Sequence, residues 1–185
     1  ADDLNGDGRP DVAAACFASD SVVMLLNAAL PVHGIAVFDP PLEVTVGDGP
    51  RELVAAPMEG LGDALPELIT SNLHDDTITI LQNPGAASDG LRISVVAIDI
   101  PAGEDPDTIL PGDLDEEKGI NFDLVVAAKG PDGSSVISVI LNLGGLEFAP
   151  AVQLPVGDEL RSMALLDLDQ DGPDGAGDLD LAVIV

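Results

Sequence analysis

The sequence has no Trp, no Tyr and only four Phe among its 185 residues. Its apolar residues are mostly Ala, Val, Leu and Ile, so we expect a core of small and branched side chains. Sugar-binding sites often stack a sugar face on an aromatic ring, and this chain offers little material for such a platform. The composition therefore weakens a lectin-like function that binds glycans, which we keep only as an alternative.

Basic residues are scarce too. The chain has six Lys and Arg against 34 Asp and Glu, and its formal net charge is -28. A field of that sign repels nucleic acid and anionic membrane surfaces and attracts cations. Hydrophobic residues nevertheless make up 46% of the chain, which distinguishes it from a disordered acidic tail. We therefore expect a folded domain with no nucleic-acid partner.

The chain also contains just one cysteine and no long apolar run. Cys16 has no partner for an internal disulfide. Its neighbours in AAACFA predict a buried strand residue, because free cysteines are usually buried and inert. No stretch approaches the roughly 20 apolar residues that cross a bilayer as a helix, so we expect no membrane span.

Oxygen-bearing side chains, in contrast, crowd the opening stretch ADDLNGDGRPDV. They take the first, third, fifth and ninth places of one loop, at Asp3, Asn5, Asp7 and Asp11. Ca²⁺ is a hard cation that binds roughly 6–8 oxygen ligands. Gly8 permits a sharp turn, and we expect the carbonyl of Arg9 to supply a further ligand while its cationic side chain points away. The loop predicts a calcium site.

An acidic loop of this kind also occurs in turns without an ion and in helical calcium-binding proteins. Without an ion, two like charges about 4 Å apart repel by about 4 kcal/mol at an effective dielectric constant of about 20, and a divalent cation reverses that sign. A solvated acidic turn is the plain alternative, since Asp, Asn and Gly favour turns. An EF-hand or a dockerin also begins DxNxDG, but an EF-hand requires Glu in the twelfth place. That place holds Ala14, and the residues that follow favour a strand.

The loop recurs in altered form as MEGLGDALPEL (58–68), GDLDEEKGINFDL (112–124) and LDLDQDGPDGAGDLDL (166–181). The first acidic residues of the four copies, at spacings of 56, 54 and 54, are Asp3, Glu59, Asp113 and Asp167. A constant spacing of this size indicates a repeat architecture.

Four short apolar segments follow one another in each repeat. Rich in β-branched residues and separated by Gly, Pro, Asn and Asp, they are typical of strands. The first segments are 11–18, 67–72, 123–128 and 180–185. The second, each ending in Asn, are 21–27, 77–83 and 135–142. The third are 38–47, 92–103 and 147–157, and the fourth are 52–57, 107–112 and 163–168.

Four antiparallel strands per repeat are typical of a β-propeller blade. We expect an all-β fold, a β-propeller segment of about 3.4 repeats. Three strands, two full four-stranded antiparallel blades and two further strands would form an incomplete ring within a single domain, 1–185. The expected repeats are 1–48, 49–104, 105–158 and the partial 159–185. A β-solenoid usually has shorter repeats, and stacked sandwiches do not repeat their loops so regularly, which makes both weaker alternatives.

The four loops offer different ligands. The first is intact. The third offers Asp113, Asp115, Glu117 and Asp123, and the fourth offers Asp167, Asp169, Asp171 and Asp180. The second keeps Glu59, Asp63 and Glu67, but it has Leu61 in its third place, so we expect no ion there. The sequence thus predicts about three calcium sites.

The motifs together resemble the FG-GAP/VCBS repeat family, whose blades carry a DxNxDGxxD loop followed by a hydrophobic strand. The resemblance rests on VGDGPRELVAA (46–56), DLNGDGRPDVAAA (3–15) and SVVMLLN (21–27), and it covers essentially the whole chain. It implies that each loop joins the innermost strand of a blade to the second. It also implies an extracellular protein similar to integrin α-subunit heads, some lectins and secreted bacterial surface proteins, where millimolar Ca²⁺ fills even weak loops.

We therefore expect a calcium-binding, non-catalytic β-propeller segment of a secreted or cell-surface protein, with a structural or adhesive role. Its partner would be a protein or glycan at a cell surface, or copies of itself. The chain stops inside the apolar run DLDLAVIV (178–185), so we expect either a piece of a longer protein or an open end completed by another chain. In the second case, strand pairing between chains would build an extracellular fibre or oligomer.

An enzyme is the least favoured alternative. The two histidines, His33 and His74, stand beside turns in different repeats, and neither is paired with a nucleophile in a recognisable motif. We expect both to be surface residues. Neighbouring carboxylates can perform acid–base catalysis, but most of the carboxylates in the loops are already accounted for as metal ligands.

Overall fold

The computed structural model describes the chain except for residues 29–36, 59–64, 84–99, 116–120, 158 and 167–178. The described residues form thirteen β-strands and no helix, so none of them belongs to a helix able to cross a membrane. The strands are β1 (Val12–Cys16), β2 (Ser21–Leu25), β3 (Leu42–Thr45), β4 (Pro50–Ala56), β5 (Glu67–Asn72), β6 (Thr77–Leu81), β7 (Ile100–Pro101), β8 (Ile109–Gly112), β9 (Asp123–Lys129), β10 (Ser135–Ile140), β11 (Val152–Gly157), β12 (Ser162–Leu166) and β13 (Asp180–Ile184). Each overlaps a predicted segment, which confirms the all-β class.

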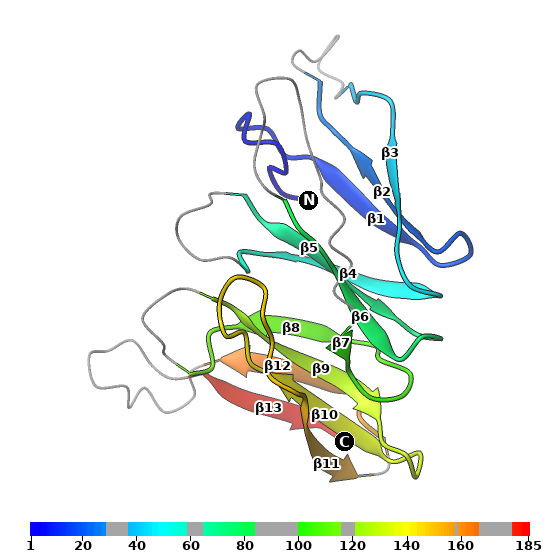
Figure 1. The fold of residues 1–185 in the computed structure, drawn as a ribbon, viewed down its shortest axis with the longest axis vertical. Coiled ribbons are helices and arrows are strands. Elements are labelled where there is room, and N and C mark those ends of the chain that lie inside the picture. Colours follow the sequence, from blue (N-terminus) through cyan, green and yellow to red (C-terminus); the bar gives the residue numbers. More distant parts are fainter. Residues whose placement is uncertain (29–36, 59–64, 84–99, 116–120, 158, 167–178) are drawn as a thin grey trace.

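The strands pair into four antiparallel sheets that follow one another along the chain. Sheet 1 is β1-β2-β3, sheet 2 is β4-β5-β6-β7, sheet 3 is β8-β9-β10-β11 and sheet 4 is β12-β13. Sheets 1, 2 and 3 succeed one another down the long axis of the molecule, and β12 and β13 overlap sheet 3 in this view (Figure 1). Within each sheet, strands adjacent in sequence are also neighbours in space. The predicted succession of three, four, four and two strands is confirmed, and the described part of the chain does not close into a ring.

Apolar clusters fill the spaces between successive sheets. Successive side chains of a strand point to opposite faces. On β5, Leu68 packs with sheet 1, while Ile69 joins the cluster shared with sheet 3. On β9, Leu124 joins that same cluster, and Val125 packs with Met163 of sheet 4. The central strand β9 is buried on both faces and is accordingly a continuous apolar run from Leu124 to Ala128. The central strand β5 is also buried on both faces, but it includes the buried polar residues Thr70, Ser71 and Asn72.

Sheets 1 and 4, at the two ends of the stack, are less buried. Every residue of β1 and of β13 is exposed or half-buried. Large apolar side chains therefore reach the surface there, among them Val12, Leu42, Val183 and Ile184, the last of which is 61% exposed.

Polar contacts in the turns join adjacent sheets. Asp20 and Asp76, in the β1–β2 and β5–β6 turns, have positive φ angles of 51° and 58°, a conformation that Asp adopts more readily than most residues. Their Oδ1 atoms accept the backbone N–H groups of Gly49 and Asp105, both at 3.0 Å. Each carboxylate thus binds the backbone shortly before the first strand of the next sheet, Gly49 before β4 and Asp105 before β8. The two contacts are equivalent and lie one repeat apart.

Two single-residue expectations have different outcomes. Cys16 lies in β1 as predicted, but it is half-buried instead of buried, because β1 belongs to an end sheet. His74 is a surface residue as predicted, with a side chain that is 51% exposed. Its Nδ1 lies 2.9 Å from Oδ1 of Asp48, and its ring meets that of Phe17 edge-on. His33 lies outside the described residues.

Candidate metal centre

The last carboxylate of each acidic loop stands at the start of a strand. Asp11 immediately precedes β1, while Glu67, Asp123 and Asp180 are the first residues of β5, β9 and β13. Asp11, Glu67 and Asp123 are buried, with at most 1% of their surface exposed. The four positions lie 56, 56 and 57 residues apart, which makes them the most regular feature of the repeat.

Each of the three buried carboxylates accepts a backbone N–H from the beginning of its own loop. The donor–acceptor pairs are Leu4–Asp11 at 2.9 Å, Met58–Glu67 at 2.7 Å and Leu114–Asp123 at 2.8 Å. Asp11 and Asp123 also accept the N–H of the Asn after the second strand, from Asn27 and Asn142, both at 2.8 Å. One buried side chain thus closes the loop and fixes it to a neighbouring strand.

The Asn residues also link each loop to the one before it. The side-chain amide of Asn83 donates to the carbonyl of Leu4 at 2.8 Å, and that of Asn142 donates to the carbonyl of Met58 at 2.7 Å. Leu4 and Met58 belong to the acidic loops of the preceding sheets. The loops of sheets 1, 2 and 3 therefore lie side by side along one edge of the stack.

These contacts correct the alignment of the second loop. Met58 takes the place of Leu4, so Pro57 takes the place of Asp3, and Glu59 does not. In this alignment the second loop lacks a carboxylate in its first ligand place, which holds Pro57. The sequence spacing had instead indicated that the third place lacks one. Glu59 and Asp63 lie outside the described residues.

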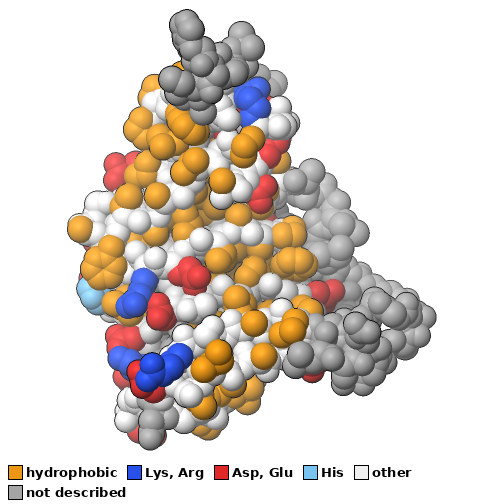
Figure 2. Space-filling model, turned by 180° about the vertical axis from the view of Figure 1, so that it is seen from behind, with side chains coloured by type: hydrophobic (Ala, Val, Ile, Leu, Met, Phe, Trp, Pro, Cys, Tyr) orange, Lys and Arg blue, Asp and Glu red, His pale blue; other side chains and the backbone are white. Residues whose placement is uncertain are grey.

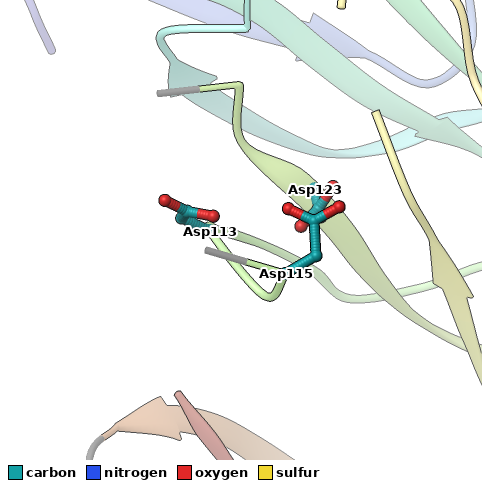
Figure 3. Close-up of side chains that lie close together, drawn as sticks. All are labelled: Asp113, Asp115 and Asp123. Atoms are coloured by element: carbon teal, nitrogen blue, oxygen red, sulfur yellow. The ribbon is translucent and has the colours of Figure 1, made fainter. Parts of the chain in front are cut away.

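The third loop brings three of the predicted ligands together. Asp113 and Asp115 follow β8, Asp123 begins β9, and their side chains gather where the two strands meet (Figure 3). One carboxylate oxygen of each lies within 4.8 Å of the others. Asp115 is exposed, Asp113 is half-buried and Asp123 is fully buried. This group could hold a metal ion, and no other group of acidic, His or Cys side chains in the described part of the chain is arranged in this way.

The electrostatics of this group differ from those of a solvated turn. Burial raises the pKa of Asp123, the N–H groups of Asn142 and Leu114 oppose that rise, and the charges of Asp115 and Asp113 add to it. In addition, Oδ1 of Asp113 is buried without a hydrogen-bond partner. Buried polar atoms usually have such a partner. The loop therefore contains a carboxylate oxygen without a hydrogen-bond partner in the part of the chain that the structure describes.

The first loop matches the motif best, and it satisfies its oxygen atoms internally. Oδ1 of Asp3 accepts the N–H groups of Gly6 and Asp7 at 2.8 and 3.2 Å, and Oδ2 accepts that of Gly8 at 2.7 Å. Burial acts to raise the pKa of Asp3, but hydrogen bonds from Gly8, Gly6, Asp7 and Asn5 together lower it. Gly8 has a φ of 81°, as the predicted sharp turn requires.

The expected orientation of the Arg9 side chain is wrong. Its side chain does not point away, but forms an ion pair with the carboxylate of Asp7 and donates from Nε to the carbonyl of Asn27 at 2.9 Å. Opposite charges two residues apart attract, which explains the contact. The carboxylates of Asp3, Asp7 and Asp11 are not grouped as those of the third loop are. The carbonyl of Arg9 as a metal ligand stays a prediction.

The fourth loop is described only at its end. Asp180 pairs with Leu166 across the sheet, as Asp123 pairs with Gly112, so it holds the equivalent place in the repeat. Its other predicted ligands, Asp167, Asp169 and Asp171, lie outside the described residues, as does Glu117 of the third loop. The fourth site stays a prediction.

Sequence reasoning missed a structural role of the carboxylates that stand at the starts of strands. It treated Asp11 and Asp123 as ion ligands only, although both also hold backbone N–H groups. A signal was present in the Asn that ends each second segment, at Asn27, Asn83 and Asn142. An amide recurring beside a recurring carboxylate indicates a repeated polar contact.

Comparison with protein-family models, with curated proteins and with solved structures gives no match.

Proposed function

We propose that the chain is a calcium-binding, non-catalytic segment of a β-propeller, in a secreted or cell-surface protein with a structural or adhesive role. The group Asp113, Asp115 and Asp123 carries this proposal, because three carboxylates with oxygen atoms within 4.8 Å repel one another. A divalent cation turns that repulsion into attraction. Carboxylate oxygens on a loop are ligands that Ca²⁺ prefers.

The propeller part is supported by how the sheets are built and packed. Sheets 2 and 3 are four-stranded antiparallel meanders, which is the composition of a propeller blade. The first strands of successive sheets contact one another, β4 with β8 and β8 with β12. Strands arranged around a common axis make such contacts. In that arrangement all the acidic loops open on the same face of the ring.

In this proposal calcium acts as a structural cross-link. Asp113 and Asp115 follow β8 and Asp123 begins β9, so one ion held by all three ties two strand ends together. The first loop, with Asp3, Asn5, Asp7 and Asp11, and the fourth, with Asp167, Asp169, Asp171 and Asp180, supply the same ligand types. Millimolar Ca²⁺ outside cells fills even weak sites of this kind, which favours an extracellular location.

Asp115→Asn tests the calcium proposal. Because Asp115 is the exposed member of the group, its substitution should weaken calcium binding at the third loop without changing the fold. Calorimetric titration of the unaltered chain should detect about three sites, and the variant should lose one. Calcium should also raise the melting temperature of the variant less.

Asp132→Asn is the matched control, since Asp132 is an exposed residue in the turn at the far end of β9. It should retain every site. Absence of calcium binding to the unaltered chain would contradict the proposed function. An equal loss of binding in the control would mean that net charge, and not the third loop, holds the ions.

The exposed apolar side chains of the end sheets favour a second function. Val12 and Leu42 on sheet 1, and Val183 and Ile184 on sheet 4, are all at least 38% exposed. As an alternative, we propose that copies of the chain associate through these sheets into an oligomer or fibre, since open sheet edges accept strands from neighbours. Mass measurement in solution tests this alternative. A single 18.8 kDa species at all concentrations would contradict it.

A further inference from the structure

A cleft of about 730 Å³ lies where sheets 2 and 3 meet. It reaches Lys129, at the opposite end of β9 from Asp123, and is separate from the acidic loops. Its size falls within the roughly 300–1,000 Å³ of typical ligand sites. The apolar lining comes from Ile100, Pro101, Phe148, Ala149, Pro150 and Ala151. The polar rim comes from Asp76, Glu104, Lys129 and Gln153.

The walls of the cleft are fixed by contacts between the two sheets. The backbones of Glu104 and Lys129 exchange two hydrogen bonds, at 2.9 and 2.6 Å. Between the sheets, Gly103 has a φ of 101°, and a Cβ placed there would lie 2.9 Å from the Cβ of Ala128. Only glycine permits so close an approach with that backbone conformation. The cleft is thus formed before any partner arrives.

The rim of the cleft carries an excess of negative charge. Lys129, the basic residue of the rim, forms an ion pair with Asp105 at 2.5 Å. Its one positive charge is therefore outnumbered by the carboxylates of Asp105, Asp76 and Glu104. Seen from behind, the molecule shows few basic side chains, and those near its lower end lie beside acidic ones (Figure 2). An occupant that combines an apolar group with a positive charge suits both the floor and the rim.

In the described part of the chain, the cleft also borders sheet edges that pair with no further strand. β7 and β11 are the last strands of sheets 2 and 3. On β11, Val152 and Leu154 are 59% and 45% exposed, while Gln153 between them lines the cleft. An edge strand can accept an extended peptide, whose alternate side chains then point to the same side. Pro150 and Pro155 limit the available stretch to 151–154, so the peptide segment must be short.

We propose that this cleft docks a short, extended segment of a partner protein in which apolar and basic residues alternate. The apolar side chains pack on Phe148 and the neighbouring prolines, and the basic ones face Asp76 and Glu104. The proposal specifies the kind of partner that the adhesive role would involve. It does not depend on calcium binding.

Two short acetylated peptides test this proposal, one alternating Val with Lys and one alternating Val with Glu. Each is titrated into the ¹⁵N-labelled chain in chelator, and amide shifts are followed by NMR. The Val–Lys peptide should shift the signals of Gln153 and its neighbours saturably, and the Val–Glu peptide should not. Glu104→Lys should weaken binding about tenfold. Ala151→Leu, which fills the floor without changing charge, should weaken it too.

Asp39→Lys is the control, since it makes a charge reversal on an exposed residue of the connection between β2 and β3, and it should leave the affinity almost unchanged. No shift of the cleft signals with the Val–Lys peptide would overturn the proposal. So would equal binding of the two peptides, or equal losses in Glu104→Lys and Asp39→Lys. Because calcium is absent from this titration, the calcium proposal is judged by its own experiment.

Discussion

At the scale of single residues, the acidic loops divide two tasks among chemically identical side chains. Asp123 is fully buried and accepts two backbone N–H groups. Asp115, whose carboxylate lies close by, is exposed. The first residue is therefore needed for folding as well as for the ion, while we expect the second to serve mainly the ion.

Asp123→Asn should consequently lower the free energy of unfolding by about 1–3 kcal/mol even in excess chelator. The Asn side chain has one accepting oxygen where Asp has two, so the N–H of either Leu114 or Asn142 loses its partner. Asp115→Asn should change that free energy by less than about 0.5 kcal/mol. Urea unfolding of both variants in chelator measures the difference. Equal effects would contradict the division of tasks.

Arg9 supplies the first loop with a cation of its own. Its ion pair with Asp7 must be broken or displaced before Asp7 can bind calcium. Arg9→Gln should therefore tighten calcium binding at this loop by about two- to fivefold, since a partly exposed ion pair is worth about 0.2–1 kcal/mol. Arg161→Gln, which removes the exposed pair with Glu159, serves as the control in the same calorimetric titration. Unchanged or weaker binding by Arg9→Gln would show that Arg9 does not compete with the ion.

At the scale of strands, the local sequence was sufficient to predict which segments form strands. The predicted segment 67–72 coincides with β5, and 123–128 differs from β9 by one residue. Apolar runs too short for helices and bounded by turn residues are local signals. The number of strands in each sheet followed from them as well, because each strand pairs with its neighbour in sequence.

The site was less predictable, because its geometry depends on residues far apart in the chain. The amide of Asn83 reaches the carbonyl of Leu4 across 79 positions, and no loop motif encodes that contact. The spacing identified Asp113, Asp115 and Asp123 as ligand types. It could not show that the best-matching loop places Arg9 on Asp7 while the weaker third loop gathers its carboxylates.

The junction between β4 and β8 gives a prediction about pH. Oε2 of Glu52 accepts the N–H of Ile109 at 2.5 Å. Burial raises the pKa of Glu52 above its ordinary value of 4.5, the Ile109 N–H opposes this, and the charge of Asp107 adds to it. A raised folded-state pKa means that ionisation costs stability, so this contribution is present below pH 4.5 and is lost as the pH rises through the folded value.

Glu52→Gln stays neutral and should escape that loss. The melting temperature of the unaltered chain relative to the variant should therefore fall as the pH is raised from 4 to 7. A difference in melting temperature between the two proteins that stays constant over this pH range would contradict the prediction. It would show that Glu52 has the same pKa in the folded and unfolded chains.

At the scale of the whole molecule, the chain has a net charge of -28, and the acidic loops of sheets 1, 2 and 3 lie along one edge of the stack. Self-repulsion of that size destabilises a compact state, and under the proposed function divalent ions bound at the loops reduce it. The same stack leaves apolar side chains exposed on sheets 1 and 4. Calcium should therefore stabilise each chain and also ease contact between chains.

The electron density at the third loop, in a crystal grown with saturating calcium, tests the central claim most directly. The account predicts one ion bound by Asp113, Asp115 and Asp123, with oxygen ligands at about 2.3–2.6 Å. Density that fits only water between carboxylates turned away from one another would contradict it.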